Sequence, residues 1–423
     1  MTYQSELILD LRQMIWDERL WKRFVRRMKR RVCLGDCAEM GVLCVKDLRN
    51  RNAFETQVLV KGFLSEYLDK YRPLDMGICD VRQKRVALPL VAETESNTYL
   101  FYSTRLAMLR TNSNAAGYLM RYFLDLRLFY NEGYANFLFF EEELERMLVL
   151  QNKGYREVCQ EGSILDFVRR QLCEGFYVNV HLDEFYIQEK DYYGERHFVH
   201  ENLIYGFDDE KQVFYAYGMA GRQQTVEFLI SYEEFLLAFE KGKLFYFCGA
   251  GYLEQEGYYP ITIYQISESA ACEFSEDILF EKLSAFLNPP ENEQVEGDIH
   301  IYGKNVYDWI LQDLTGEHVR NIVDYRVVHL LYEHKCCIRS RLEYLRQRGE
   351  LSDIGQKILT EMKGIINDFQ KIRFQYLQQL KKEGKLYSMD KMVENSEVKT
   401  YIAEQLGAAI KREESILGEI CEK

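Results

Sequence analysis

The residues of this sequence whose chemistry and setting are most informative are two histidines. His200 lies within residues 197–218, which read HFVHENLIYGFDDEKQVFYAYG, and His197 lies three residues earlier. A histidine acts as a general base when a proton donor is within hydrogen-bond reach and a second group binds its other ring nitrogen. Because an odd separation places the two on opposite faces of an extended chain, we do not expect both to serve one site. His200 is the candidate base, and a hydrogen-bonded structural histidine is the alternative.

Two strand-like runs follow His200 and would give it a rigid mount. Residues 203–207 and 212–217 are rich in aromatic and β-branched residues, and they flank the polar turn 208–211, Asp-Asp-Glu-Lys. Such residues suit a pleated, half-buried surface, and a short polar turn between two such runs predicts a β-hairpin. His200 would then stand at the start of the first strand.

Three regions of the chain differ in hydrophobic period. Residues 1–75 are predicted to form a helical domain, because Ile8, Leu11 and Ile15 recur at helical spacing. Residues 76–290 mix strand and helix periods. Residues 291–423 are predicted to be a helical domain, with long helices at 323–348, 353–383 and 393–419.

The middle region alternates irregularly between the two periods. Strands are expected at 85–91, 176–180, 244–248 and 259–266, and helices at 99–110, 115–130, 164–173, 231–241 and 275–287. Ser231 could cap its helix ahead of Glu233 and Glu234. Strands interrupted in this way indicate an α+β layout and not a regular βαβ repeat.

Three stretches of the sequence resemble one family. HENLIYGFDDEKQVFYAYG with TVEFLISYEEFLLAF, then LPLVAETESNTYLFYSTRLAML, then VDYRVVHLLYEHKCCIRSRLEYL resemble the butirosin biosynthesis protein H N-terminal family. The resemblance covers residues 90 to 345. It implies a papain-like α+β core, residues 76–290, between two helical domains. It also implies a place beside peptide and polyketide assembly lines, where the best known member transfers an aminoacyl group from a carrier protein to an aminoglycoside.

The resemblance assigns roles to particular positions. The family histidine falls on His200. The family cysteine is expected just before the helix predicted at 99–110, where a helix N-terminus lowers the pKa of a thiol. This chain has no cysteine between positions 79 and 159, and Ser96 is the nearest hydroxyl. Ser96 is therefore the candidate nucleophile, although a serine is weaker than a thiolate and depends more on an oriented base.

The family acid is expected at the end of the second hairpin strand. Residues 216–218 read Ala-Tyr-Gly at that place, so no carboxylate is identified. A site filled by Tyr217 or Tyr99 would indicate a protein that binds and does not catalyse.

Other clusters give weaker candidates. His329, Glu333 and His334 share one predicted helix, but only two of them can face a metal together, and no third ligand is evident. Most cysteines are expected to pack in the core, among them Cys33, Cys37, Cys44, Cys336 and Cys337. Cys79 would reach the site only with a shifted alignment, and the dipole of its helix would disfavour a thiolate at Cys173. We expect no bound cofactor and no metal.

A basic run near the N-terminus is the candidate partner surface. It comprises Lys22, Arg23, Arg26, Arg27, Lys29, Arg30 and Arg31. Such a run is either a solvated helix face or a docking surface for an acidic carrier protein. The following segment, Leu-Gly-Asp-Cys-Ala, has Cys37 where a carrier protein would present its attachment serine, so a degenerate carrier-like or docking domain is a further interpretation.

Composition limits the class of protein. Apolar residues make up 47% of the 423 residues and aromatic residues 14%, which indicates a folded chain. The net charge of −13 argues against general nucleic-acid binding. The 11 cysteines include no CxxC pair, and the sequence shows neither a signal-peptide core nor an apolar run long enough to cross a membrane. We therefore expect a protein of the reducing cytoplasm.

Together these observations predict an acyl- or aminoacyl-transferase-like protein of a nonribosomal peptide or polyketide pathway. The acyl group would arrive as a thioester on the phosphopantetheine of an acyl or peptidyl carrier protein. His200 would act as base toward a small-molecule amine or alcohol, or toward Ser96, and a base-only mechanism is chemically possible because thioesters are already activated. The alternative, favoured by the missing cysteine and acid, is a catalytically degenerate member that binds or scaffolds a pathway partner.

Overall fold

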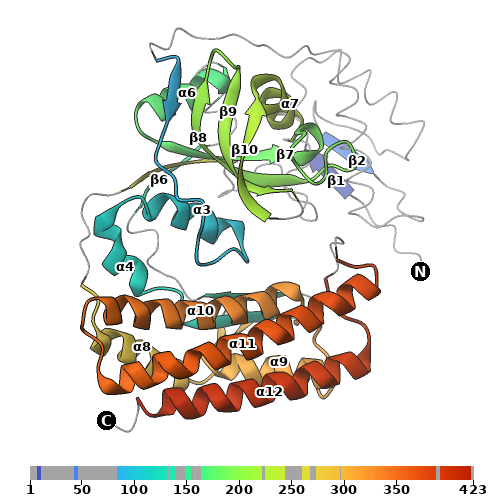
Figure 1. Ribbon diagram of the computed structural model, residues 1–423. Coiled ribbons are helices and arrows are strands. Elements are labelled where there is room, and N and C mark those ends of the chain that lie inside the picture. The colour runs from blue at the N-terminus through green and yellow to red at the C-terminus, as the bar shows by residue number, and fades with distance from the viewer. Residues whose placement is uncertain are drawn as a thin grey trace. The chain divides into compact units, whose positions relative to one another are not determined.

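The structure is a computed structural model of the 423-residue chain (Figure 1). It describes residues 7–10, 42–45, 83–131, 134–139, 148–153, 158, 163–221, 224–242, 260–266, 273–295, 297–386 and 391–420. The chain divides into two compact units. The sheet unit comprises Met1–Ala92 and Val149–Gln265, and the helical unit comprises Glu93–Leu148 and Ile266–Lys423.

The sheet unit is built on a seven-stranded sheet in the order β10-β9-β8-β7-β11-β6, with β3 paired to β8 (Figure 1). Neighbouring strands from β10 to β11 run antiparallel, as do β3 and β8. The strands are β3 (Arg85–Ala87), β6 (Leu148–Lys153), β7 (Tyr177–Asp183), β8 (Val199–Asp208), β9 (Val213–Ala220), β10 (Gln224–Ser231) and β11 (Ile261–Ile266). The predicted hairpin is confirmed as β8 and β9, and His200 lies at the second position of β8.

Two helices form the core of this unit with the sheet. The apolar face of α6 (Ile164–Cys173) and that of α7 (Tyr232–Gly242) share one hydrophobic cluster with β7, β8, β9, β10 and β11. Alternate residues of β7, namely Val178, Val180 and Leu182, are fully buried in that cluster. Each such side chain contributes roughly 1.5–3 kcal/mol through burial.

Polar contacts fix the ends of these elements. The predicted cap of α7 is confirmed: the Ser231 hydroxyl accepts from the Glu234 N–H at 3.2 Å, and the Glu234 carboxylate accepts from the Ser231 N–H at 2.9 Å. This reciprocal pair is a capping box. In the β8–β9 turn, the Asp209 carboxylate binds buried Arg169 of α6 and the Tyr232 hydroxyl of α7. The hairpin that carries His200 is thus tied to both helices.

The helical unit combines helices with a small sheet (Figure 1). Its helices are α3 (Leu100–Leu109), α4 (Ala116–Met120), α8 (Glu276–Leu287), α9 (Asn305–Thr315), α10 (Tyr325–Gln347), α11 (Asp353–Lys382) and α12 (Ser396–Gly418). The helices predicted at 323–348, 353–383 and 393–419 are confirmed as α10, α11 and α12 to within three residues at each end. Asp324, Ser352 and Asn395 cap their N-termini with side-chain oxygens.

The helix predicted at 115–130 is wrong over its second half. Helix α4 ends at Met120, and β4 (Leu126–Asn131) follows as a strand. Phe123 between them has a positive φ of 63°, a conformation that no helix continues through. Strand β4 lies between β5 (Tyr134–Phe139) and β13 (Asp298–Tyr302), and β12 (Glu293–Val295) completes this antiparallel sheet. Of the two partners of β4, β13 lies far along the sequence, whereas β5 begins three residues after β4 ends.

The N-terminal region departs from its prediction where it is described. Residues Leu7–Asp10 and Val42–Val45 form an antiparallel pair, β1 and β2, where helix was expected. Backbone pairing between distant segments here overrides a helical hydrophobic spacing. The basic run from Lys22 to Arg31 lies outside the described residues.

The α+β class is confirmed by these antiparallel sheets and their helices. The domain limits predicted at 75 and 290 remain predictions. None of the described helices is both long and apolar enough to cross a bilayer.

Candidate functional site

His200 is held by a carboxylate that the sequence did not point to. Its Nδ1 lies 3.2 Å from Oε1 of Glu184, a residue of the short 3-10 helix η3 (Glu184–Tyr186) that follows β7. The Glu184 side chain is 4% exposed and the His200 side chain 27% exposed. An imidazole that donates its Nδ1 proton to a carboxylate keeps a lone pair on Nε2, which is the arrangement of an oriented general base. Glu184 thus supplies a carboxylate partner for His200, which residues 216–218 do not.

His197 forms a second, separate pair with Asp183, the residue that precedes Glu184 in the chain. Its Nδ1 lies 2.7 Å from Oδ2 of Asp183, whose side chain is fully buried. The other oxygen, Oδ1, accepts the backbone N–H groups of Phe198 at 3.0 Å and Phe185 at 3.2 Å. The two histidines therefore use different carboxylates, Asp183 and Glu184. Asp183 in addition holds the backbone, which gives His197 a structural setting that His200 does not share.

A buried lysine, Lys190, contacts the same carboxylate oxygen of Glu184 as His200 does. The ammonium of Lys190 lies 3.5 Å from Oε1 of Glu184 and donates to the carbonyl of Met219 on β9 at 2.5 Å. Its side chain is fully buried, with Nζ 4.7 Å from the centre of the Phe228 ring. Burial lowers the pKa of Lys190, and the charge of Glu184 opposes that shift. Glu184 thus contacts both the buried ammonium of Lys190 and the partly exposed imidazole of His200.

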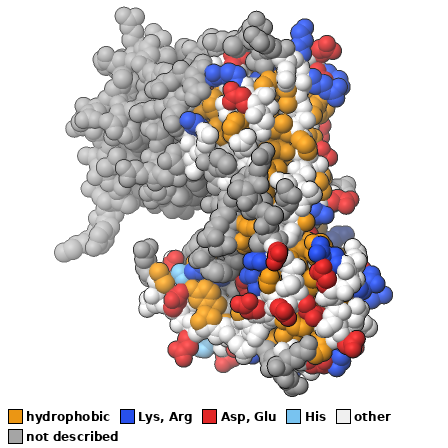
Figure 2. Space-filling model, turned by 90° about the vertical axis from the view of Figure 1, so that its left-hand side faces the viewer, with side chains coloured by type: hydrophobic (Ala, Val, Ile, Leu, Met, Phe, Trp, Pro, Cys, Tyr) orange, Lys and Arg blue, Asp and Glu red, His pale blue; other side chains and the backbone are white. Residues whose placement is uncertain are grey.

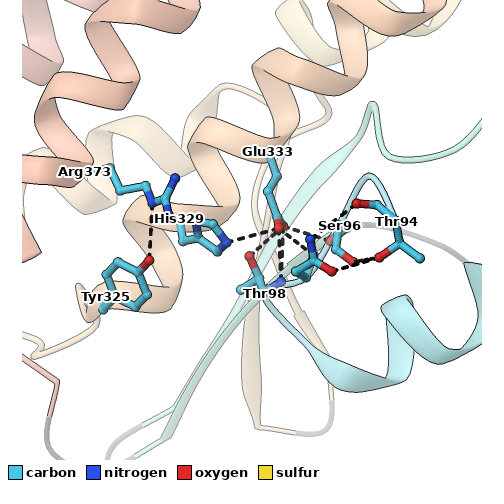
Figure 3. Close-up of polar contacts among 8 residues, drawn as sticks. Thr94, Ser96, Thr98, Tyr325, His329, Glu333 and Arg373 are labelled. Carbon is cyan, nitrogen blue, oxygen red and sulfur yellow. Dashed lines mark hydrogen bonds and ion pairs between the residues drawn. The ribbon is translucent and has the colours of Figure 1, made fainter. Parts of the chain in front are cut away.

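Ser96 is completely buried in the helical unit, and its hydroxyl donates to Glu333 of α10 at 2.8 Å (Figure 3). The same carboxylate accepts from the Thr98 hydroxyl at 2.6 Å, the Asn97 N–H at 2.5 Å and the Thr98 N–H at 3.1 Å, and it lies 3.2 Å from His329 Nε2. Figure 3 shows these groups converging on Glu333. We call this set the Glu333 cage.

The Glu333 cage explains why a carboxylate can be buried there. Two of its donors are backbone N–H groups just before α3, where the helix dipole favours a negative charge. Below the cage, buried Arg341 of α10 binds Glu95 at 2.6 Å and the carbonyls of Leu119 and Tyr122. Helix α10 therefore anchors the turn that precedes α3 with one anion and one cation.

The two candidate catalytic residues lie in different compact units, Ser96 in the helical unit and His200 in the sheet unit. Their pairing remains a prediction. Within its own unit, Ser96 already has a buried carboxylate partner, so its oxygen is not presented to solvent. Tyr217 and Tyr99 also have structural partners, since their hydroxyls donate to the carbonyls of Ala92 and Phe137 at 2.9 Å each.

The remaining candidates from the sequence, the two histidines of α10 and the cysteines, have the following contacts and surroundings where they are described. His329 contacts Glu333, whereas His334 is turned to the Leu124 carbonyl, with Nε2 at 2.7 Å. The described residues contain no group of three or more histidine, cysteine or acidic side chains that could hold a metal. Burial raises the pKa of the described thiols Cys173, Cys336 and Cys337, which disfavours the reactive thiolate. The side chains of Cys33, Cys37, Cys44 and Cys79 lie outside the described part of the chain.

Charged side chains of both signs are mixed on one face of the described residues (Figure 2). On the face in Figure 2, acidic and basic side chains of the described residues are interspersed with apolar ones. The docking surface predicted from Lys22, Arg23, Arg26, Arg27 and Arg30 stays a prediction, because these residues are not among those described.

Comparison with known proteins does not assign this chain to a family. No protein-family model matches the chain, and no curated protein matches it. The site must therefore be interpreted from its own chemistry: an oriented, partly exposed imidazole in one unit and a filled, buried carboxylate cage in the other.

Sequence reasoning found His200 but missed Glu184, Lys190 and the role of Glu333. One local signal was present for the first of these. Asp183 ends β7 and Glu184 follows it directly, and β7 pairs with the start of β8 in an antiparallel register that puts Leu182 opposite His200. Acids at the end of one strand are close to residues at the start of its antiparallel partner. No comparable local signal joins Ser96 to Glu333.

Proposed function

We propose that this protein is an acyl- or aminoacyl-transferase-like protein of a cytoplasmic nonribosomal peptide or polyketide pathway, with a papain-like core. Its donor would be a thioester on the phosphopantetheine of an acyl or peptidyl carrier protein, and its acceptor a small-molecule amine or alcohol. The single observation that carries the proposal is the His200–Glu184 pair: a partly exposed imidazole whose Nδ1 is held by a buried carboxylate at 3.2 Å.

The proposed chemistry uses His200 as the base. The acceptor nitrogen or oxygen attacks the thioester carbonyl carbon while Nε2 of His200 removes its proton. The tetrahedral intermediate then collapses, the C–S bond breaks, and the imidazolium returns the proton to the leaving sulfur. The products are an amide or ester and the free phosphopantetheine thiol. Glu184 orients the ring and stabilises the transient imidazolium.

This base-only route is favoured over an acyl-enzyme on Ser96. A serine nucleophile needs a base within hydrogen-bond reach of an accessible hydroxyl. Ser96 is fully buried, and its hydroxyl donates to Glu333. A Ser96 acyl-enzyme would require the turn before α3 to leave the Glu333 cage first.

A second function has its own support. The Glu333 cage fills the turn where the resemblance expects a nucleophile, which is what a member that has lost catalysis would contain. In that case the protein binds or scaffolds a pathway partner, and the basic run Lys22 to Arg31 is the candidate surface for an acidic carrier protein.

Intact-protein mass spectrometry distinguishes the two functions. The protein is incubated with a panel of acyl-loaded carrier proteins and with pooled amine and alcohol acceptors, and loss of the acyl group from the carrier is measured. The transferase proposal expects deacylation by the wild type, at least 100-fold slower deacylation by His200→Ala, and no covalent adduct. His197→Ala is the matched control, because it removes a neighbouring histidine with a different acid partner. Carrier binding without deacylation by any donor supports the scaffold.

A further inference from the structure

Lys190 is a buried cation for which the proposed chemistry has so far no use. It comes from the segment after η3, and its ammonium reaches across to β9, where it donates to the Met219 carbonyl. The neighbouring residue on β9 is Gly218, and a Cβ added there would lie 3.6 Å from Nζ of Lys190. That separation is ordinary van der Waals contact, so the ammonium packs directly beside the β9 backbone. A fully buried lysine is costly unless a specific partner compensates it.

Its partner is the same atom that binds His200. Oε1 of Glu184 lies 3.5 Å from Nζ of Lys190 and 3.2 Å from Nδ1 of His200. The lysine and the histidine therefore compete for one oxygen of a carboxylate that is 4% exposed. With Lys190 charged, the carboxylate is already neutralised, and a proton on His200 would add a second positive charge at close range. Without Lys190, protonation of His200 would be the way to neutralise Glu184.

Other ionisable groups face this cluster and set its background. Asp191 and Glu201 add negative charge near Lys190, and His181 lies close enough to His200 for the two to interact. Burial lowers the pKa of His181, so it stays neutral at physiological pH and adds no charge there.

We propose that Lys190 is a positioning residue that neutralises Glu184 and thereby keeps His200 unprotonated, with its hydrogen on Nδ1 and its lone pair on Nε2. This inference rests on the proposed function for its purpose, because only a base must be kept unprotonated. The protonation of His200 that it concerns can be measured on the free protein, without donor or acceptor. A carboxylate whose charge Lys190 did not neutralise would favour the imidazolium form of His200, which cannot accept a proton from an acceptor.

The test is a pH titration of the histidine ring signals by NMR on the full chain labelled with ¹³C at histidine. His200 and His197 are assigned with His200→Gln and His197→Gln. In Lys190→Met, His200 is expected to take up its proton at a pH higher by about one unit or more, from the loss of one nearby charge. His197, bound to Asp183, reports on the fold and should titrate as in the wild type. Lys190→Arg retains the charge and should restore the wild-type titration.

A double variant separates charge from packing. Lys190→Met with Glu184→Gln leaves His200 without a charged carboxylate partner, so His200 should take up its proton at a lower pH than in Lys190→Met alone. Unchanged titration of His200 in Lys190→Met, with His197 also unchanged, would overturn the inference. So would an equal upward shift in the double variant, since no carboxylate would remain to cause it.

The outcome is independent of whether a donor thioester is found. A shifted His200 titration without any carrier deacylation would leave the Lys190 inference standing and defeat the transferase proposal. Conversely, deacylation that is abolished by His200→Ala, together with an unshifted titration in Lys190→Met, would support the transferase and defeat the role of Lys190. If both hold, Lys190→Met should deacylate slowly at pH 7 and recover as pH rises.

Discussion

The hydroxyl of Ser96 donates to the carboxylate of Glu333 at 2.8 Å, and the two residues are 237 positions apart in the chain. Ser96 stands where the family resemblance expects the nucleophile, but this contact makes it part of the buried Glu333 cage. The carboxylate belongs to α10, and the turn it holds leads directly into α3. The Glu333 cage should therefore contribute to the unfolding free energy of the helical unit, and Ser96 can be tested separately for a role in catalysis.

Removing the carboxylate should destabilise the helical unit strongly. Glu333→Ala leaves buried hydroxyl and N–H donors of residues 96–98 without an acceptor, and we expect a loss of about 3–4 kcal/mol in unfolding free energy. Glu333→Gln keeps one acceptor oxygen and should cost about 1–2 kcal/mol. Hydrogen exchange by mass spectrometry on peptides from α3 and α10 measures the loss. Glu343→Ala on the exposed face of α10 is the control and should leave exchange unchanged. Equal exchange in Glu333→Ala and the wild type would show that the cage is not stabilising.

Ser96→Ala separates structure from catalysis. It removes one donor to Glu333 and should lower stability by about 1 kcal/mol, because the other donors remain. If His200 acts alone as base, the variant should deacylate carrier proteins at close to the wild-type rate in the mass-spectrometric assay. A covalent acyl adduct on the wild type that Ser96→Ala lacks would instead identify Ser96 as a nucleophile and show that the turn opens.

A fully buried ion pair between α10 and α12 gives a second stability prediction. Lys335 and Glu413 are both 0% exposed and lie 2.6 Å apart, and the Tyr307 hydroxyl of α9 donates to Glu413 at 2.6 Å. Lys335→Met should cost about 3–5 kcal/mol, because it strands the carboxylate in the core. The double variant Lys335→Met with Glu413→Leu should regain much of that loss, since an apolar pair needs no compensation. Urea unfolding followed by helical circular dichroism compares the wild type, both single variants and the double variant, and additive losses would exclude this coupling.

His334 predicts a pH dependence of stability. Burial and the neighbouring Lys335 cation hold the pKa of His334 well below its usual value near 6.5. The folded state therefore keeps His334 neutral while the unfolded state takes up a proton below that pH, so unfolding free energy falls as pH falls. The slope reaches about 1.4 kcal/mol per pH unit for one proton. His181, whose pKa burial also lowers, adds a similar term.

His334→Gln should reduce this acid sensitivity. The amide can donate to the Leu124 carbonyl and accept from Lys335 as the imidazole does, but it does not titrate. Unfolding free energies measured at pH 7.5, 6 and 5 should fall less steeply in this variant than in the wild type. His318→Gln, at an exposed position, should retain the full slope. The same slope in both variants would show that His334 does not cause the acid sensitivity.

Local elements of this fold could largely be predicted from the sequence, because their causes are local. The period of apolar residues and the caps at Ser231, Ser352 and Asn395 account for α7, α11 and α12. Alternation around a polar turn accounts for β8 and β9. Prediction was wrong for β1, whose pairing is supplied by the distant strand β2, and for β4, which pairs both with its chain neighbour β5 and with the distant strand β13.

The candidate site divides in the same way. By itself, the sequence determined that a histidine stands at the start of a hairpin strand, because side-chain type and strand pattern are written locally. It also determined that no cysteine lies between positions 79 and 159, so none stands just before α3. Only the tertiary structure decided which carboxylate each group meets: Glu184 for His200 and Glu333 for Ser96. The physical reason is that buried polar groups must find partners wherever the packed elements bring them, and sequence distance places no limit on that choice.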